Sequence, residues 1–177
     1  RNAAEKSSAE TVVMKNTEPM TRFTRSYLPA LMFCPIIDEP AVLKALAEKG
    51  VDLKDHPSLQ VREYIYDMAP VMRAADLVIC RAGASTVSEL TALGVPAIMV
   101  PSPYVTNNHQ EKNARALETH GGVEVLLEQD SSGQALFQAA AGILRDDARR
   151  EAMASAMAEL GIRDAAQRIY ETVQELL

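Results

Sequence analysis

The residues best placed to do chemistry in this 177-residue sequence form a run of small side chains between an apolar segment and a helical one. Residues Arg81-Ala-Gly-Ala-Ser-Thr86 follow the apolar run 77–80 and lead into a helix predicted over 85–93. Small side chains let a ligand approach the backbone. The unpaired N–H groups and positive dipole end of a helix N-terminus favour an anion. The motif alone predicts either a phosphate or diphosphate site or an ordinary strand-to-helix turn.

Glu89 lies in the same predicted helix and has two interpretations. The segment Thr86-Val-Ser-Glu89 has the spacing of a capping box, in which the glutamate returns to the N–H of the capping residue. A carboxylate one turn into the helix can also accept hydrogen bonds from two neighbouring ribose hydroxyls, because it offers acceptors and no donor. The spacing by itself favours the cap.

A second polar segment, residues 101–113, connects the apolar run 97–100 to a helix predicted over 107–119. It contains several amide side chains and one imidazole, His109. Amides donate and accept hydrogen bonds, which suits the hydroxyls of a sugar, and long polar loops often carry function. Helix capping beside a solvated helix face explains the same residues, so both interpretations stay open.

Short apolar runs that alternate with amphipathic helices position these loops. We predict an α/β fold with a Rossmann-like, mostly parallel sheet flanked by helices. The strands are expected at 30–37, 59–64, 77–80, 97–100 and 123–127, and the helices at 41–49, 67–74, 85–93, 107–119, 134–145, 147–160 and 164–177. Ligands of such sheets bind beyond the carboxyl ends of the strands, where both polar loops begin.

The sequence divides into an irregular or altered N-terminal segment, residues 1–29, and one α/β domain, residues 30–177, with a helical C-terminal end. Within the first segment, residues 9–16 have a helical pattern without a strand before them. Doubly wound domains usually open with a strand, so we expect an element to be missing or altered there.

Composition excludes several classes of function. The net charge is −6, with 18 basic and 24 acidic residues, which disfavours nucleic acid as a partner. Cys34 and Cys80 lie in apolar runs and are predicted to be buried, reduced thiols. No P-loop, G-x-G-x-x-G, nucleophile elbow, metal-ligand cluster or glycosidase carboxylate pair is present. No apolar run reaches the roughly 20 residues of a membrane span.

Three segments together resemble a known family. They are Tyr64-Ile-Tyr-Asp-Met68, Ala75-Asp-Leu-Val-Ile-Cys-Arg-Ala-Gly-Ala-Ser-Thr-Val-Ser-Glu-Leu90, and Gly94-Val-Pro-Ala-Ile-Met-Val-Pro101 running into Asn107-Asn-His-Gln-Glu-Lys-Asn113. Over about residues 40–177 the chain resembles the C-terminal half of the MurG-type N-acetylglucosaminyltransferases of peptidoglycan synthesis. That family has the GT-B fold, in which two Rossmann-like domains face each other across a cleft.

The resemblance implies a role for each residue of the two polar loops. The backbone of Ile65 would meet uracil, with Met68 nearby, and Glu89 would bind the ribose hydroxyls rather than cap the helix. The diphosphate would lie among the backbone amides around Gly83, on Ala84, Ser85 and Thr86. His109 and Gln110 would contact N-acetylglucosamine, and Asn113 would support their loop.

The resemblance also implies a reaction. The complete enzyme would transfer N-acetylglucosamine from UDP-N-acetylglucosamine to the lipid-linked muramyl-pentapeptide acceptor, with inversion and without a metal cofactor, converting lipid I to lipid II. The acceptor domain would carry the general base and a peripheral contact with the cytoplasmic face of the membrane. Since that domain is absent, the chain is expected to be inactive alone.

Two features depart from the family pattern. Lys6-Ser-Ser-Ala-Glu10 stands where the family has a glycine-rich turn on the diphosphate, and residues 17–37 fit poorly. The alternatives are a UDP-sugar-binding subunit of a split glycosyltransferase and another GT-B enzyme, such as a sugar-nucleotide epimerase. A nicotinamide-binding domain is the least favoured because the glycine fingerprint is missing.

Overall fold

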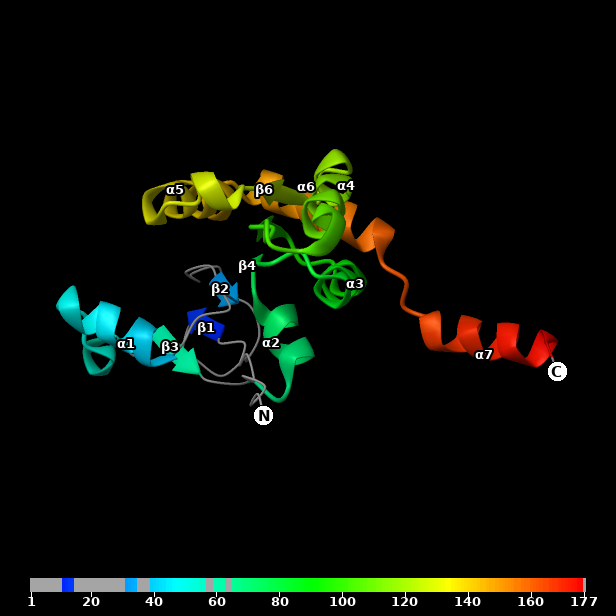
Figure 1. Cartoon of the computed structure of the whole chain (residues 1–177), viewed down its shortest axis with the longest axis horizontal. Coiled ribbons are helices and arrows are strands. Elements are labelled where there is room, and N and C mark those ends of the chain that lie inside the picture. The colour runs from blue at the N-terminus through cyan, green and yellow to red at the C-terminus, as the bar shows by residue number, and fades with distance from the viewer. Residues whose placement is uncertain (1–10, 15–30, 35–38, 57–58, 63–64, 177) are drawn as a thin grey trace.

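The computed structural model describes residues 11–14, 31–34, 39–56, 59–62 and 65–176. Its centre is a six-stranded sheet with the strand order β3-β1-β2-β4-β5-β6 (Figure 1). The strands are β1 Thr11–Met14, β2 Leu31–Cys34, β3 Leu59–Arg62, β4 Leu77–Cys80, β5 Ala97–Met99 and β6 Val123–Val125. Strands β2, β4, β5 and β6 are parallel, which confirms the predicted α/β class.

Helices follow the strands as the sequence predicts. Within the described residues they are α1 Glu39–Glu48, α2 Met68–Ala74, α3 Ala84–Leu93, α4 His109–Thr119, α5 Gly133–Leu144, α6 Asp147–Leu160 and α7 Ala165–Glu175. Short 3₁₀ turns lie at Leu53–Asp55, Thr106–Asn108 and Glu128–Asp130. The ends of the seven α-helices differ from the predicted ends by at most a few residues, as expected for helices that fray.

The predicted helix over residues 9–16 is wrong where the structure describes it. Residues Thr11–Met14 form β1, which is antiparallel to both of its neighbours. Val12 is the register partner of Phe33 on β2 and of Val61 on β3. The segment Thr-Val-Val is β-branched and therefore disfavours a helix, and the two neighbouring strands supply hydrogen-bond partners that a local pattern cannot reveal. The remainder of segment 1–29 and the predicted strand end 35–37 lie outside the described residues.

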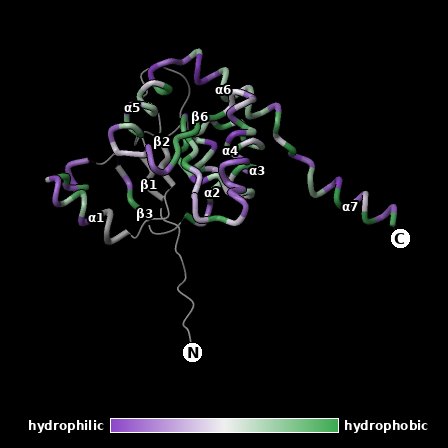
Figure 2. The backbone as a smooth tube through the Cα atoms, turned by 45° about the horizontal axis from the view of Figure 1, so that its top comes forward, coloured by the Kyte–Doolittle hydropathy of each residue, from purple (hydrophilic) through white to green (hydrophobic). Residues whose placement is uncertain are grey.

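Both faces of β4 and β5 are covered, which explains why these two strands are continuously apolar. Along β4, Val78 and Cys80 point to one face, with Met72 of α2, Leu90 of α3 and Leu117 of α4. The alternate residues of β4 point to the other face, together with side chains of α5 and α6. Figure 2 shows that hydrophobic residues gather at this strand layer, between the helices.

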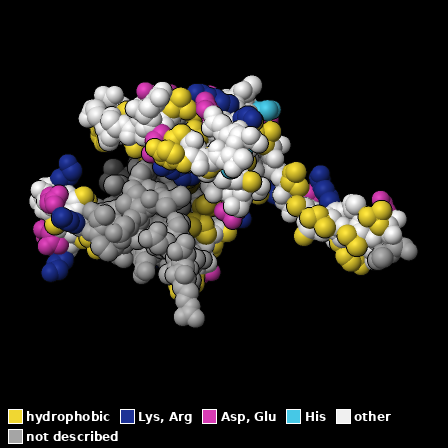
Figure 3. Space-filling model, viewed as in Figure 1, with side chains coloured by type: hydrophobic (Ala, Val, Ile, Leu, Met, Phe, Trp, Pro, Cys, Tyr) yellow, Lys and Arg dark blue, Asp and Glu magenta, His cyan; other side chains and the backbone are white. Residues whose placement is uncertain are grey.

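The chain ends in a helix that projects from the rest of the fold. Helix α7 extends to one side after α6 (Figure 1), and its described side chains are exposed. Apolar residues stand on its surface in the space-filling view (Figure 3), among them Ile169, Tyr170 and Val173. No helix among the described residues is long and apolar enough to cross a bilayer.

Candidate functional site

The N-terminus of α3 opens at the carboxyl edge of the parallel strands. Gly83 is the N-cap residue, with φ −68° and ψ 151°, and the helix starts at Ala84. The main-chain N–H of Val87 donates to the carbonyl of Gly83 at 2.9 Å. The N–H groups of Ala84, Ser85 and Thr86 precede this bond and point out of the helix end, and the glycine cap has no side chain to accept from them. These three N–H donors and the positive end of the helix dipole are therefore available to a ligand at the start of α3.

Nothing in the described protein requires glycine at position 83. Its φ is one that any residue adopts, and a Cβ placed there would meet Thr86 Oγ1 at 3.9 Å, an ordinary contact. Ala84 and Ser85 are exposed. Neither the backbone conformation nor contact with the described residues explains the glycine at this cap position.

The loop before α3 is fixed from two sides. The side-chain amide of Asn113, on α4, donates to the carbonyl of Ala82 at 3.1 Å. Ala82 is fully buried, and the Arg81 guanidinium donates through Nη1 to the carbonyl of Val100 at 3.0 Å. Loop 81–83 is therefore anchored both to α4 and to the residue that follows β5.

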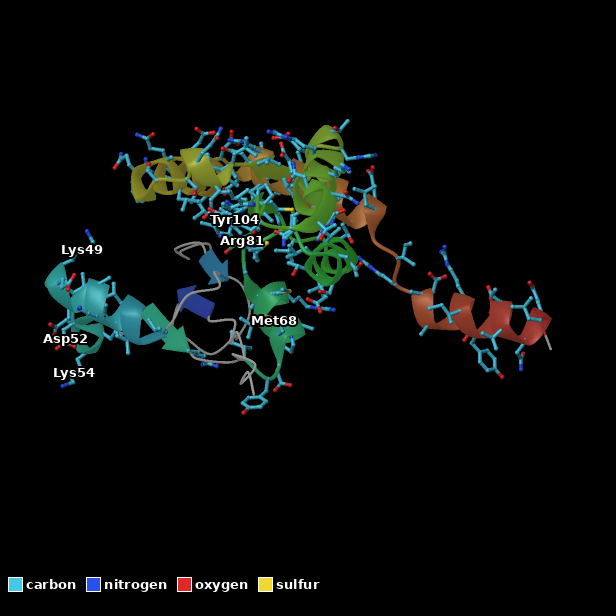
Figure 4. All side chains as sticks on the ribbon, in the orientation of Figure 1. Lys49, Asp52, Lys54, Met68, Arg81 and Tyr104 are labelled. Carbon is cyan, nitrogen blue, oxygen red and sulfur yellow. The ribbon has the colours of Figure 1, made fainter. Side chains whose placement is uncertain are left out.

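The Arg81 Nη1 atom also donates to the carboxylate of Glu128, in the 3₁₀ turn after β6. This hydrogen bond and the charge of the guanidinium hold the pKa of the Glu128 carboxyl below its usual range, against the opposing effect of desolvation. Arg81 thereby joins the carboxyl ends of three adjacent strands, β4, β5 and β6. Figure 4 labels Arg81 and Tyr104, which belong to the loops after β4 and β5.

The loop after β5 is closed by Gln110. Its Oε1 atom accepts a hydrogen bond from the main-chain N–H of Ser102 at 2.9 Å, across the loop. The N–H of Tyr104 donates to Ser102 Oγ at 3.4 Å, and the Tyr104 side chain is exposed. Because Oε1 is engaged, the Nε2 amide group is the part of Gln110 that can bind a ligand as a donor.

His109 begins α4, and its ring nitrogen Nδ1 lies 2.9 Å from the carbonyl of Thr106. A carbonyl only accepts, so Nδ1 carries a proton, and in the neutral ring Nε2 is an acceptor. Asn107 and Asn108 precede it with φ of 55° and 51°, a left-handed conformation that asparagine tolerates well. The Nδ2 atom of Asn108 donates at 2.5 Å to Glu111, in the first turn of α4, so a side chain of the helix stabilises the turn that leads into it.

Ile65 and Met68 lie between β3 and the first turn of α2. Ile65 is buried and Met68 is the first residue of α2. Both contact the hydrophobic cluster that contains Ala82 and Leu90. Because β2 and β3 are both antiparallel to β1, and β2 is parallel to β4, strands β3 and β4 run in the same direction, so Ile65 and loop 81–83 follow strand ends at the same edge of the sheet. Met68 is marked on α2 in Figure 4.

Glu89 is exposed in the second turn of α3. The capping-box interpretation is wrong, because Thr86 is the third residue of the helix and Gly83 is its cap. The helical rise places Glu89 about 7.5 Å along the axis from Ala84. The start of α3 has no side-chain capping hydrogen bond.

Sequence reasoning missed the contributions of Arg81, Ser102 and Glu128. Arg81 stands in a motif quoted above and directly follows a buried strand, and Ser102 lies in the polar segment 101–113. Glu128 gave no local signal, because its partner lies 47 residues away. The described residues contain no group of three or more His, Cys, Asp or Glu side chains that could hold a metal ion.

The chain is similar to known proteins of one family. Residues 38–169 match the model of the glycosyltransferase family 28 C-terminal domain. The UDP-N-acetylglucosamine--N-acetylmuramyl-(pentapeptide) pyrophosphoryl-undecaprenol N-acetylglucosamine transferase of Acetivibrio thermocellus is 50% identical over 121 residues, 68% of this chain and 33% of that protein. A similarly named transferase of Bacillus cereus is 43% identical over 137 residues, 77% of this chain and 36% of the relative.

Solved structures agree with this fold. The crystal structure of Acinetobacter baumannii MurG superposes with a TM-score of 0.60 at 32% identity, over 66% of this chain and 35% of that one. A kitacinnamycin glycosyltransferase superposes with a TM-score of 0.52 at 23% identity, over 65% of this chain and 30% of the other, which supports the fold alone. The chain spans about a third of the length of the curated relatives.

Proposed function

Because the chain belongs to the glycosyltransferase family 28 C-terminal domain family, we propose that it binds UDP-N-acetylglucosamine as the donor-binding half of a GT-B glycosyltransferase. The transferases of Acetivibrio thermocellus and Bacillus cereus are named for transfer of N-acetylglucosamine to an undecaprenol-linked muramyl-pentapeptide. The proposed reaction is the same transfer, which converts lipid I to lipid II in peptidoglycan synthesis.

The open N-terminus of α3 carries this proposal. Three main-chain N–H groups precede the first helical hydrogen bond, and Gly83 is required neither by backbone conformation nor by packing. A diphosphate that approaches the backbone closely would explain the absence of a side chain there. Its negative charge would meet the positive end of the helix dipole.

In this proposal the other residues would bind the remaining parts of the nucleotide sugar. Ile65, before α2, would meet uracil through its main chain, with Met68 beside it. Glu89, one and a half turns into α3, would accept hydrogen bonds from the ribose hydroxyls. At the start of α4, His109 offers an acceptor at Nε2 and Gln110 a donor at Nε2, which suits the hydroxyls and acetamido group of the sugar.

The proposed chemistry is direct displacement at the anomeric carbon with inversion. As the bond to UDP breaks, negative charge grows on the leaving diphosphate, and the fixed N–H donors of Ala84, Ser85 and Thr86 stabilise that charge without reorganising. We expect this arrangement to serve in place of a metal ion, so that EDTA leaves transfer by the two-domain enzyme unchanged. The acceptor half would supply the general base, the lipid-linked acceptor site and a peripheral contact with the cytoplasmic face of the membrane. This chain alone would transfer no sugar.

Calorimetric titration of the purified chain tests donor binding. We expect UDP-N-acetylglucosamine to bind, UDP-glucose to bind more weakly, and NAD to give no heat of binding. Gly83→Val places a branched side chain over the N–H groups and should abolish UDP binding, while circular dichroism and the melting temperature stay close to wild type because the site is open. Equal binding by Gly83→Val, or binding of NAD in place of UDP, would overturn the proposal.

A further inference from the structure

Arg81, the first residue of loop 81–83, makes a charged contact with a residue far away in sequence, Glu128. Arg81 Nη1 donates both to the carbonyl of Val100 and to the carboxylate of Glu128. The Arg81 side chain is only 30% exposed and that of Glu128 39%, so the pair is partly withdrawn from water. Glu128 belongs to the short 3₁₀ turn between β6 and α5, outside every motif that resembles a nucleotide-sugar site.

This contact bears directly on the anion site. Arg81 is separated from the cap residue Gly83 only by Ala82, which is fully buried and held by Asn113. A guanidinium fixed at both Val100 and Glu128 restricts the main chain that leads into α3. Without Glu128, the long arginine side chain regains rotameric freedom, and part of the free energy of ligand binding is lost in ordering the loop again.

We propose that Glu128 is a positioning residue for the donor diphosphate: through Arg81 it fixes loop 81–83, and so it raises the affinity for the anion without touching it. The inference rests on the proposed function and names a residue that supports the same site. Glu128 also brings a negative charge toward an anionic ligand, which opposes binding. The two effects predict opposite results, so variants of Glu128 can separate them.

The first test compares Glu128→Ala with Glu128→Gln by calorimetric titration with UDP. Glutamine keeps an oxygen that accepts from Arg81 but removes the charge, so we expect its affinity within about twofold of wild type. Alanine removes the acceptor, and we expect UDP to bind about five- to tenfold more weakly. If both variants bind UDP as tightly as wild type or more tightly, the positioning role is refuted while the proposed function survives. If wild type binds no UDP, the proposed function itself fails.

The second test separates positioning from a general loss of stability. Glu124, on β6, forms a similarly exposed pair with Arg149 at 2.7 Å, remote in sequence from loop 81–83. Glu124→Ala is the matched control, and we expect it to shift the melting temperature about as much as Glu128→Ala but to leave UDP affinity unchanged. Equal losses of UDP affinity in the two variants would show that any broken ion pair has this effect.

A double-mutant cycle tests whether Glu128 acts through Arg81. In an Arg81→Ala background, Glu128→Ala should change UDP affinity by less than about twofold, because the contact that it serves is already gone. Additive losses would contradict the proposal. Uridine binding, measured by changes in amide chemical shifts, should be the same in wild type, the two single variants and the double variant. The predicted uracil contact at Ile65 lies outside loop 81–83.

Discussion

The side-chain amide of Asn113 donates a hydrogen bond to the main-chain carbonyl of Ala82 at 3.1 Å, joining residues 31 positions apart. One lies on α4 and the other in the loop before α3. The resemblance to a known family implies that Asn113 supports the polar loop after β5. The hydrogen bond assigns it a further task, which is to hold the loop after β4.

The first prediction concerns this hydrogen bond. Asn113→Ala leaves a buried carbonyl at Ala82 without its partner, which should cost about 1–3 kcal/mol of unfolding free energy. UDP affinity should fall about fivefold as the loop loosens. Urea unfolding and calorimetric titration measure the two effects. Gln138→Ala removes an exposed amide on α5 and should change neither quantity; a similar loss of UDP affinity in that control would contradict a specific role for Asn113.

The second prediction concerns Glu89. Since its side chain is exposed and Gly83 rather than Thr86 caps α3, Glu89→Ala should change unfolding free energy by less than about 0.5 kcal/mol. Loss of a ribose contact should weaken UDP binding about tenfold or more, a change of roughly 1.4 kcal/mol. The deoxynucleotide dUDP lacks one of the two hydroxyls, so the variant should discriminate far less between UDP and dUDP than wild type does. If Glu89→Ala discriminates between UDP and dUDP as strongly as wild type does, the Glu89 carboxylate does not bind the ribose hydroxyls.

The third prediction separates folding from binding at a close contact. A Cβ at Gly161, between α6 and α7, would lie 2.4 Å from the carbonyl oxygen of Thr91 on α3. Gly161→Ala therefore requires the main chain to shift and should cost about 1–3 kcal/mol, measured by urea unfolding. A Cβ at Gly142, inside α5, would meet Nη1 of Arg149 at 3.9 Å, an ordinary contact, and Gly142→Ala should stabilise by about 0.5–1 kcal/mol. UDP affinity should stay constant in both folded proteins.

The fourth prediction concerns the pH dependence of stability. The hydrogen bond from Arg81 lowers the pKa of Glu128, so its contribution to stability is complete above the unfolded pKa of about 4.3 and is lost as pH falls through the lower folded value. The difference in unfolding free energy between wild type and Glu128→Gln should thus be less than about 1 kcal/mol at pH 7 and vanish in strong acid. Asp164, whose pKa is lowered chiefly by its hydrogen bond from Arg168, titrates alike in both proteins and cancels. A difference that grows as pH falls would contradict the assigned pair.

The order of strands and helices from α1 onward could be predicted from sequence because each element carries a local signal. Leu77–Cys80 is apolar throughout and forms β4 with the predicted bounds. Gly94 has φ 68° and ends α3, as a glycine after a helical pattern predicts. The small residues before α3 likewise indicated a turn that leads directly into a helix N-terminus, which the structure places at Ala84; the anion site there stays a prediction.

The sequence alone thus determined the α/β class, the position of the two polar loops after β4 and β5, and the family to which the chain belongs. Only the tertiary structure decided that Thr11–Met14 is a strand, that Thr86 does not cap α3, and that Asn113 and Glu128 both hold loop 81–83. The physical reason is the range of the interactions. Apolar periodicity and helix termini are set within a few residues, whereas strand pairing and side-chain anchors join residues many positions apart, whose proximity is defined only when the sheet has formed.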